Sequence, residues 1–507
     1  MSKTKITQML IVLSLIMLVT VLAGADQKKT NNPPPAKPAP SAKPAQPAAK
    51  PAAKPAQPAV RPAQRPTTTQ RPMTTQRPIT TQRPMTTQRP VTTQRPQTTR
   101  RPQTTERPKT TQRPVTTVSK PVRLRNGESG TVTYHNNRVA DIHTKDMTIH
   151  RDLHGGQTAV SEHNGRTTVT TGHSGGYVQR TYLNRNGRTY YQRTYVVGGR
   201  SYARVYRGYE YRGHHYYGYV PGYYYHPVFY GWAYNPWVSP VYFGPAAWGW
   251  VGTPWFGFYG GFFTPYPVYP SASLWLTDYL IAANLQAAYQ AQAEANAATT
   301  AGAGQAPADN SGAPPEGGPA ASNQTPLSPE VKQAIADEVQ RQLAAEKDAA
   351  ANPQAPPAPA TDQVPDALNR AERVFVVASN LDVTVPDSGQ ECSLTAGDVV
   401  MRLSDTPDAN QNVTASIQSS KNGDCVTGDT VAIGVQDLQE MHNHFREQLD
   451  SGLQALADNG GKKGLPKAPD TATTAGEVPR PAPDSGVAEQ LSAQQQQADQ
   501  TAKQLVN

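Results

Sequence analysis

Two short motifs contain residue types that serve catalysis or metal binding in other proteins. "GHSGG" (172–176) matches the G-x-S-x-G pattern, in which Ser174 would stand as a nucleophile between a strand and a helix. The sequence that follows, "GYVQRTYLNRNG", is typical of another strand and a turn, so the glycine pair is better explained as a hairpin turn. "HRDLH" places His150 and His154 on one face at a spacing that could bind a metal. Scattered surface histidines are more common, and we expect no catalytic residue, metal or cofactor.

The chain contains two cysteines, Cys392 and Cys425, and both lie in a C-terminal segment with the pattern of a compact domain. In an oxidising compartment they would pair and close a loop of about 34 residues, which typically stabilises a fold by roughly 2–4 kcal/mol. The nearest histidines, His442 and His444, match no zinc-binding spacing. The sequence therefore predicts a disulfide.

An aromatic stretch from Tyr216 to Pro270 contains most of the six tryptophans of the chain, and no Asp, Glu, Lys or Arg occurs between Gly213 and Thr277. Pro or Gly recurs every few positions, which excludes a membrane-spanning helix and continuous strand pairing. Leu and Ile are absent from the stretch, so a conventional core is not expected either. Tyr and Trp suit amphipathic contact surfaces. We expect an irregular segment with exposed rings, and the candidate contact residues are Tyr223, Tyr230, Trp232, Trp237, Trp248, Trp250 and Trp255.

The first 25 residues have the pattern of a secretory signal peptide. Lys3 and Lys5 precede the apolar run "MLIVLSLIMLVTVLAG", and Ala23 and Ala25 form an A-x-A cleavage site. The run is short for a spanning helix. We therefore predict export, to the outside of the cell or to the periplasm and envelope, with an uncleaved single-span anchor as the alternative.

A basic spacer is expected over 26–121, rich in Pro, Lys and Arg and containing "TTQRP" hexapeptide repeats. Proline at this density favours an extended chain without a core. Residues 26–125 contain 21 Lys or Arg and two acids, against a net charge of +10 for the whole chain. Such a segment suits an anionic cell-wall polymer, a membrane surface or envelope proteins, and export argues against nucleic acid.

The remaining chain divides into strand-rich, helical and linker segments. Turn dipeptides such as Asn164-Gly165, Asn186-Gly187 and Arg207-Gly208 recur near every ten residues and predict an antiparallel β meander. The helix stripe Val331, Ile335, Val339 and Leu343 needs a partner, either another helix or a second copy of the chain. The expected segments are the meander (122–218), the aromatic segment with an amphipathic helix (219–298), a linker (299–327), a helix (328–350), a linker (351–372), a β domain with a helix (373–458) and a disordered tail with a Gln-rich helix (459–507).

The stretch "SLTAGDVVMRL" (393–403) resembles the diverging turn of bacterial SH3-like barrels, in which an L-x-x-G-D sequence leads into a strand. The resemblance implies a small five-stranded barrel, whereas the absence of Tyr and Trp from 373–458 argues against a groove for Pro-rich peptides. The rest of the chain looks like uncharacterised secreted Tyr/Gly/Pro-rich bacterial envelope proteins. The fold class expected is a mostly disordered, multi-part chain with a β meander and a small all-β barrel.

These features favour an exported structural and interaction protein of the cell envelope over an enzyme. The alternative is a module that binds glycan or peptidoglycan, with exposed Tyr and Trp stacking on sugar faces. Self-association through the helix stripe is a further expectation.

Overall fold

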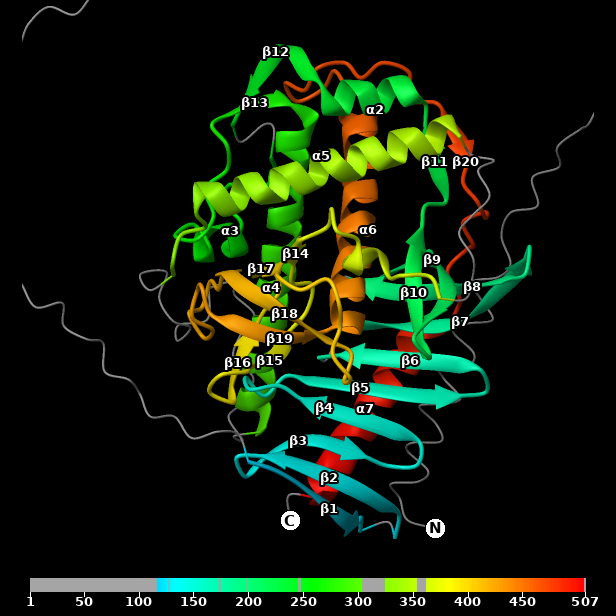
Figure 1. The fold of residues 1–507 in the computed structure, drawn as a ribbon, viewed down its shortest axis with the longest axis vertical. Helices are drawn as coiled ribbons and strands as arrows, with labels where there is room; N and C mark the ends of the chain where they lie inside the picture. Colours follow the sequence, from blue (N-terminus) through cyan, green and yellow to red (C-terminus); the bar gives the residue numbers. More distant parts are fainter. Residues whose placement is uncertain are drawn as a thin grey trace, which may run out of the picture. The chain divides into compact units, whose positions relative to one another are not determined.

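The computed structural model describes residues 116–125, 127–172, 175–197, 199–244, 248–302, 324–352 and 362–505 (Figure 1). The signal peptide with Ala23 and Ala25, nearly all of the 26–121 spacer, and Ser174 lie outside the described residues. Most of the two expected linkers, 299–327 and 351–372, also lies outside them.

A ten-stranded antiparallel meander confirms the sheet predicted over 122–218, although it begins at Thr117 and ends at Val220. Each strand pairs with the next one along the chain, as Figure 1 shows from β1 to β10. The strands are β1 (Thr117–Arg123), β2 (Ser129–His135), β3 (Arg138–His143), β4 (Met147–Arg151), β5 (Gln157–His163), β6 (Arg166–Thr171), β7 (Gly175–Arg185), β8 (Arg188–Val197), β9 (Arg200–Tyr211) and β10 (His214–Val220).

Tight turns with positive φ at both central residues set the register of the meander. Asn164-Gly165 and Asn186-Gly187 have φ values of 51° and 71°, as the primed hairpin turns require. The turn expected at Arg207-Gly208 lies instead at Arg212-Gly213. Gly208 is inside β9, where a Cβ would come within 2.6 Å of the Tyr191 ring. Close packing, and not a turn, explains this glycine.

The C-terminal segment does not form the separate disordered tail that we expected over 459–507. Strand β20 (Thr473–Ala475) pairs with β11 (Tyr223–Tyr225), and the Gln-rich helix α7 (Val487–Leu505) packs on strands β5 to β8. The side-chain amide of Gln494 donates to the carbonyls of Ala159 and Thr168 at 2.8 and 2.9 Å. A glutamine can therefore anchor this helix on a sheet because its amide satisfies strand carbonyls.

A second, six-stranded antiparallel sheet has the order β14-β17-β18-β19-β15-β16. Its ends, β14 and β16, are not paired, so the described strands form an open sheet and not the closed five-stranded barrel expected over 373–458. The strand that the sequence did not predict is β16, which contains Cys392. The strands are β14 (Val374–Val376), β15 (Leu381–Val385), β16 (Gln390–Leu394), β17 (Val399–Arg402), β18 (Asn412–Ser419) and β19 (Thr430–Gly434).

The aromatic segment forms short elements where we expected an irregular chain. Helix α2 (Pro227–Tyr234) begins with a proline after the capping residue His226, and β12 (Pro236–Tyr242) pairs irregularly with β13 (Val268–Ser271). Proline is tolerated at the first helical position because that N–H has no helical partner. The other elements are α3 (Pro254–Phe258) and the long helix α4 (Ala272–Gly302).

Two further helices complete the fold, with the short 3₁₀ turn η2 (Asp366–Leu368) between them. Helix α5 (Pro329–Ala351) begins as predicted, with the Ser328 hydroxyl accepting from the Val331 N–H at 3.2 Å. Its apolar stripe packs against α2 and α4, so the partner that the stripe requires lies in the same chain. Helix α6 (Val435–Asn459) contacts α4, β10, β14 and β19. Its apolar residues fill two cores, one with the aromatic segment and one with the second sheet.

Truncation of α6 in the core is expected to destabilise the whole described fold. Leu449 is fully buried in the aromatic core, so Leu449→Ala removes packed methyl groups and should lower the free energy of unfolding by about 2–5 kcal/mol. Urea unfolding followed by tryptophan fluorescence measures this change. Leu403→Ala, at a leucine that is 46% exposed, is the matched control and should cost less than about 0.5 kcal/mol. Equal effects of the two substitutions would contradict the packing described for α6.

Candidate functional site

The seven candidate contact aromatics lie mostly inside the protein. Tyr230, Trp237, Trp248 and Trp255 are buried, while Tyr223, Trp232 and Trp250 are partly buried. The exposed tryptophan surface that we expected is therefore not formed. The physical reason is that large rings bury more apolar area in contact with one another than Leu or Ile would, so they can supply a core without aliphatic residues.

Stacked indoles form the centre of this core. Trp248 stacks on Trp275 of α4 with ring centroids 4.4 Å apart, and on Trp250 at 3.8 Å. A second group joins Trp232 to Phe229 at 5.5 Å and to Trp237 at 5.3 Å. These contacts hold the short elements of the aromatic segment against α4 and α5.

One buried ion pair fixes the end of the aromatic segment. Asp278 is the first charged residue after it, is fully buried, and lies 2.7 Å from the Lys332 ammonium of α5. Its carboxylate also accepts from the Tyr269 hydroxyl at 2.7 Å and from the Tyr266 N–H at 2.6 Å. Burial raises the pKa of Asp278, and Lys332 opposes that shift. A lone aspartate on an apolar helix face was the signal in the sequence for this anchor.

The exposed side chains of the aromatic segment are valines and tyrosines. Tyr242 is 71% exposed, and the side chain of Val238 is fully exposed. In β12 the side chains alternate, so that Trp237 and Val241 point inward while Val238 and Tyr242 point outward. Sequence reasoning chose the tryptophans, because the two prolines of β12 concealed this strand alternation. We name the exposed group the apolar tip, which consists of Val228, Tyr234, Val238, Tyr242 and Val251.

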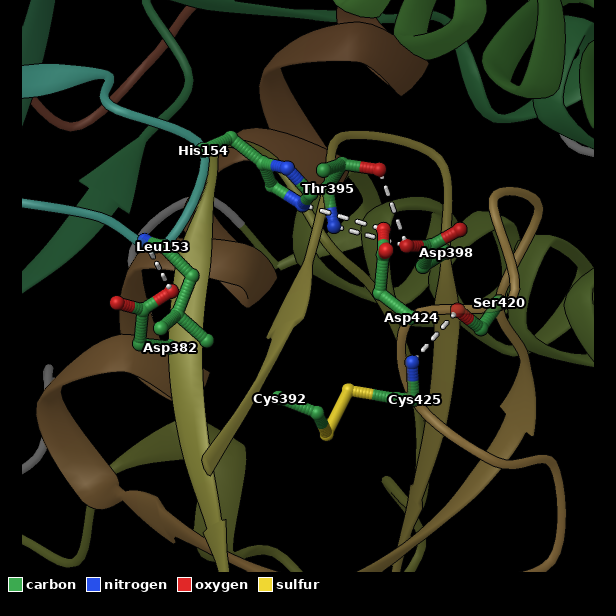
Figure 2. The surroundings of a disulfide bond; sticks show 9 residues. All are labelled: Leu153, His154, Asp382, Cys392, Thr395, Asp398, Ser420, Asp424 and Cys425. Carbon is green, nitrogen blue, oxygen red and sulfur yellow. Dashed lines mark hydrogen bonds and ion pairs between the residues drawn. A yellow bond between two sulfur atoms is a disulfide. The ribbon is translucent and has the colours of Figure 1, made fainter. Parts of the chain in front are cut away.

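The predicted disulfide between Cys392 and Cys425 is present and joins strand β16 to the loop between β18 and β19 (Figure 2). Figure 2 also shows Asp424, next to Cys425, pointing toward His154 of the meander. The His154 Nε2 atom lies 3.1 Å from the Asp424 carboxylate. The disulfide thus fixes the loop that carries a contact between the two sheets.

The L-x-x-G-D turn beside the disulfide is built around a buried lysine. Asp398 accepts from the Thr395 and Lys421 backbone N–H groups, each at 2.8 Å. The fully buried Lys421 ammonium lies 3.3 Å from the Asp398 carboxylate and donates to the Ala396 carbonyl at 2.7 Å. Burial lowers the pKa of Lys421, and Asp398 opposes that shift. These contacts tie the turn before β17 to the loop after β18.

The paired histidines of "HRDLH" contact different carboxylates. His150 Nδ1 lies 2.8 Å from Asp141 within the meander, whereas His154 contacts Asp424 of the second sheet. No group of three His, Cys, Asp or Glu residues that could hold a metal ion occurs among the described residues. Both histidines therefore have ion-pair partners that account for their positions.

A polar network joins the meander to helix α6. Arg193 of β8 is almost fully buried and binds Glu440 through two hydrogen bonds of 2.6 and 2.9 Å. Its guanidinium also lies over the Tyr206 ring, 4.0 Å from the centroid. The Tyr206 hydroxyl donates to Glu447, and the Tyr219 hydroxyl donates to Asp450 at 2.7 Å. The sheet packs on α6 through tyrosines and charges, which suits strands that have no cleanly apolar face.

Among the described helices, none is both long enough and apolar enough to span a bilayer.

The pair between His154 and Asp424 makes stability depend on pH. The hydrogen bond to Asp424 raises the pKa of His154 above 6.5, partial burial opposes the shift, and Asp152 and Asp382 add to it. Because the folded-state pKa is raised, the pair stabilises fully below the unfolded-state pKa and its contribution is lost as pH rises through the folded-state pKa. His154→Gln should therefore be less stable than wild type near pH 5.5 and equal to it at about pH 9, as measured by urea unfolding. His163→Gln, at an exposed histidine of β5, is the control, and a deficit that is the same at both pH values would contradict the prediction.

The buried Glu447 should give the opposite pH dependence. Burial raises its pKa from 4.5 to about 7, against the effects of Arg204, Tyr206 and Arg193. The folded state then binds more protons than the unfolded state, so the free energy of unfolding falls as pH rises from 4.5 to about 7, by about 3 kcal/mol at most. Glu447→Gln should lack this fall, whereas Glu489→Gln, at an exposed position of α7, should keep it. Urea unfolding across this range measures the slope, and a wild-type slope in Glu447→Gln would exclude the effect.

Comparison with known proteins gives one partial match. The family model described as Cementoin, the trappin protein transglutaminase binding domain, matches residues 63–89, within the hexapeptide repeats and outside the described residues. This is a small part of the 507-residue chain and does not assign the chain to that family. Among curated proteins and among solved structures, no match to the chain was found.

Proposed function

We propose that this chain is an exported structural and interaction protein of the cell envelope without catalytic activity. The signal peptide over 1–25 directs export, and the basic Pro-rich segment over 26–121 is a spacer that carries the folded part. The observation that supports an interaction role best is the apolar tip, because monomeric proteins rarely leave such side chains together in water.

The disulfide supports export, since disulfides persist in oxidising compartments. The absence of an enzymatic role is supported by the contacts of the acids and histidines described above. His150, His154 and Glu440 are each paired with an opposite charge in positions that join strands, sheets or a helix. Such pairs are typical of structural networks.

The partial match over residues 63–89 adds detail to the spacer. The model's name refers to transglutaminase binding, and the matched repeats place a glutamine every six residues, at Gln64, Gln70, Gln76, Gln82 and Gln88. Covalent attachment of such glutamines to amines would fix the spacer to a polymer network. This form of attachment belongs to the same structural role.

Glycan or peptidoglycan binding is the second candidate function. The exposed ring of Tyr242, with that of Tyr234, supports it, because sugar faces stack on accessible aromatic rings. The tryptophans named in the sequence do not add to this support, since their faces are covered by other rings.

Export predicts that the mature protein begins at Asp26, because Ala23 and Ala25 provide the small residues of a cleavage site. Mass spectrometry of the N-terminal peptide from the source cells measures this. Ala25→Lys should block processing and leave the chain with its apolar N-terminus, whereas Lys28→Ala, beyond the site, should be processed like wild type. An intact Met1 in the wild-type protein would overturn the proposal of a cleaved, exported chain.

A further inference from the structure

The apolar tip stands out among the exposed large apolar side chains. Its five residues lie between positions 228 and 251, on α2, on β12 and in the loop after β12. The sequence around them has no charged side chain from Gly213 to Thr277. The tip is thus an apolar surface without the interspersed charges that normally keep a protein surface hydrated.

Lysines border the apolar tip. Lys462, Lys463 and Lys467 are exposed in the loop that follows α6. Leu465 of this loop is buried in the aromatic core, and the His226 N–H before α2 donates to the Ala472 carbonyl at 3.0 Å. Figure 1 shows the loop, in orange-red, passing along the same end of the fold as α2 and β12. An uncharged apolar surface therefore has a positive border.

The edge of β12 argues against a partner that adds a β-strand. Among the described strands, β12 pairs only with β13, so its other edge is free. Pro236 and Pro240 have no N–H group to donate along it. Proline on an edge strand is a common protection against strand addition. The surface therefore fits a partner that requires no backbone hydrogen bonds.

We propose that the apolar tip docks on the interface of an anionic lipid bilayer. Val238 and Tyr242 enter the boundary between headgroups and acyl chains, where valine loses contact with water and the tyrosine hydroxyl stays hydrated. Lys462, Lys463 and Lys467 contact the phosphate groups around the tip, and each lysine near an anionic surface strengthens attachment about fivefold. The protein rests on the surface and does not span the bilayer. This inference rests on the proposed function, of which it names the contact partner.

A fluorescent label on the tip tests the proposal in the mature chain with its disulfide intact. Both native cysteines are in the disulfide, so Val238→Cys introduces a single free thiol, which is labelled with the environment-sensitive dye NBD. Val197→Cys, at a valine that is 53% exposed at the end of β8, is the matched control. Both variants retain the basic spacer, so adsorption through the spacer is the same in both. The probes are vesicles of phosphatidylcholine alone and of phosphatidylcholine with about one third phosphatidylglycerol.

With anionic vesicles, the dye at position 238 should shift to shorter wavelength and brighten, while the dye at 197 should not change. Replacing the three lysines by serine in the Val238→Cys background should weaken the apparent affinity, by about fivefold for each lysine at low salt. Vesicles of phosphatidylcholine alone should give a weaker response.

Three results would overturn docking on lipid. They are an unchanged dye at 238 while the protein sediments with vesicles, equal responses at 238 and 197, and a response at 238 to purified wall polymer but not to vesicles. The last result would establish the glycan alternative. The N-terminal mass spectrum is independent of these outcomes. A processed chain with a silent dye at 238 retains export and loses lipid docking, whereas an intact Met1 with a responsive dye loses export and retains docking.

Discussion

The bidentate ion pair between Arg193 and Glu440 lies where strand β8 meets helix α6, and much of the fold is organised around this helix. A buried charge without a partner costs several kcal/mol, so the arginine and the acids of α6 must be in register with each other. Tyr206 and Tyr219 extend the same contact along the helix to Glu447 and Asp450. The other faces of α6 are apolar and complete both the aromatic core and the core of the second sheet. One helix therefore fixes the positions of three layers.

The aromatic segment depends on the same helix for its partners. Without Leu or Ile, its Tyr216–Pro270 stretch fills a core with stacked indoles, and Leu449 and Leu453 of α6 contribute to that core. The single buried pair of Asp278 and Lys332 sets where the stretch meets α5. Because the tryptophans are used inside, the smaller valines and the tyrosines are left at the surface. The composition that suggested a contact surface thus produces both a core and a tip.

The two sheets are joined on the side away from the aromatic core by polar contacts. His135 lies 2.6 Å from Glu391 of β16, and His154 lies 3.1 Å from Asp424. Both acids are adjacent in sequence to a cysteine of the disulfide. An edge strand and a loop that would otherwise move independently are therefore linked covalently where they meet the meander.

The sequence alone determined the features that depend on local chemistry. Asn-Gly pairs predicted the hairpins of the meander, Ser328 and Pro329 predicted the start of α5, and the cysteine count predicted the disulfide. These features are local in their cause, because a turn or a cap needs only a few neighbouring residues.

Only the tertiary structure decided which side chains are available to a partner. Trp248 and Val238 lie in the same uncharged stretch, yet one is in the core and the other is fully exposed. Pairing of β12 with β13 sets that alternation, and the covering helices α4 and α5 come from distant parts of the chain. The closed barrel expected over 373–458 failed for the same reason. Strand β16 is an edge strand that pairs only with β15 and is linked by the disulfide to a distant loop, and such long-range contacts leave no local pattern.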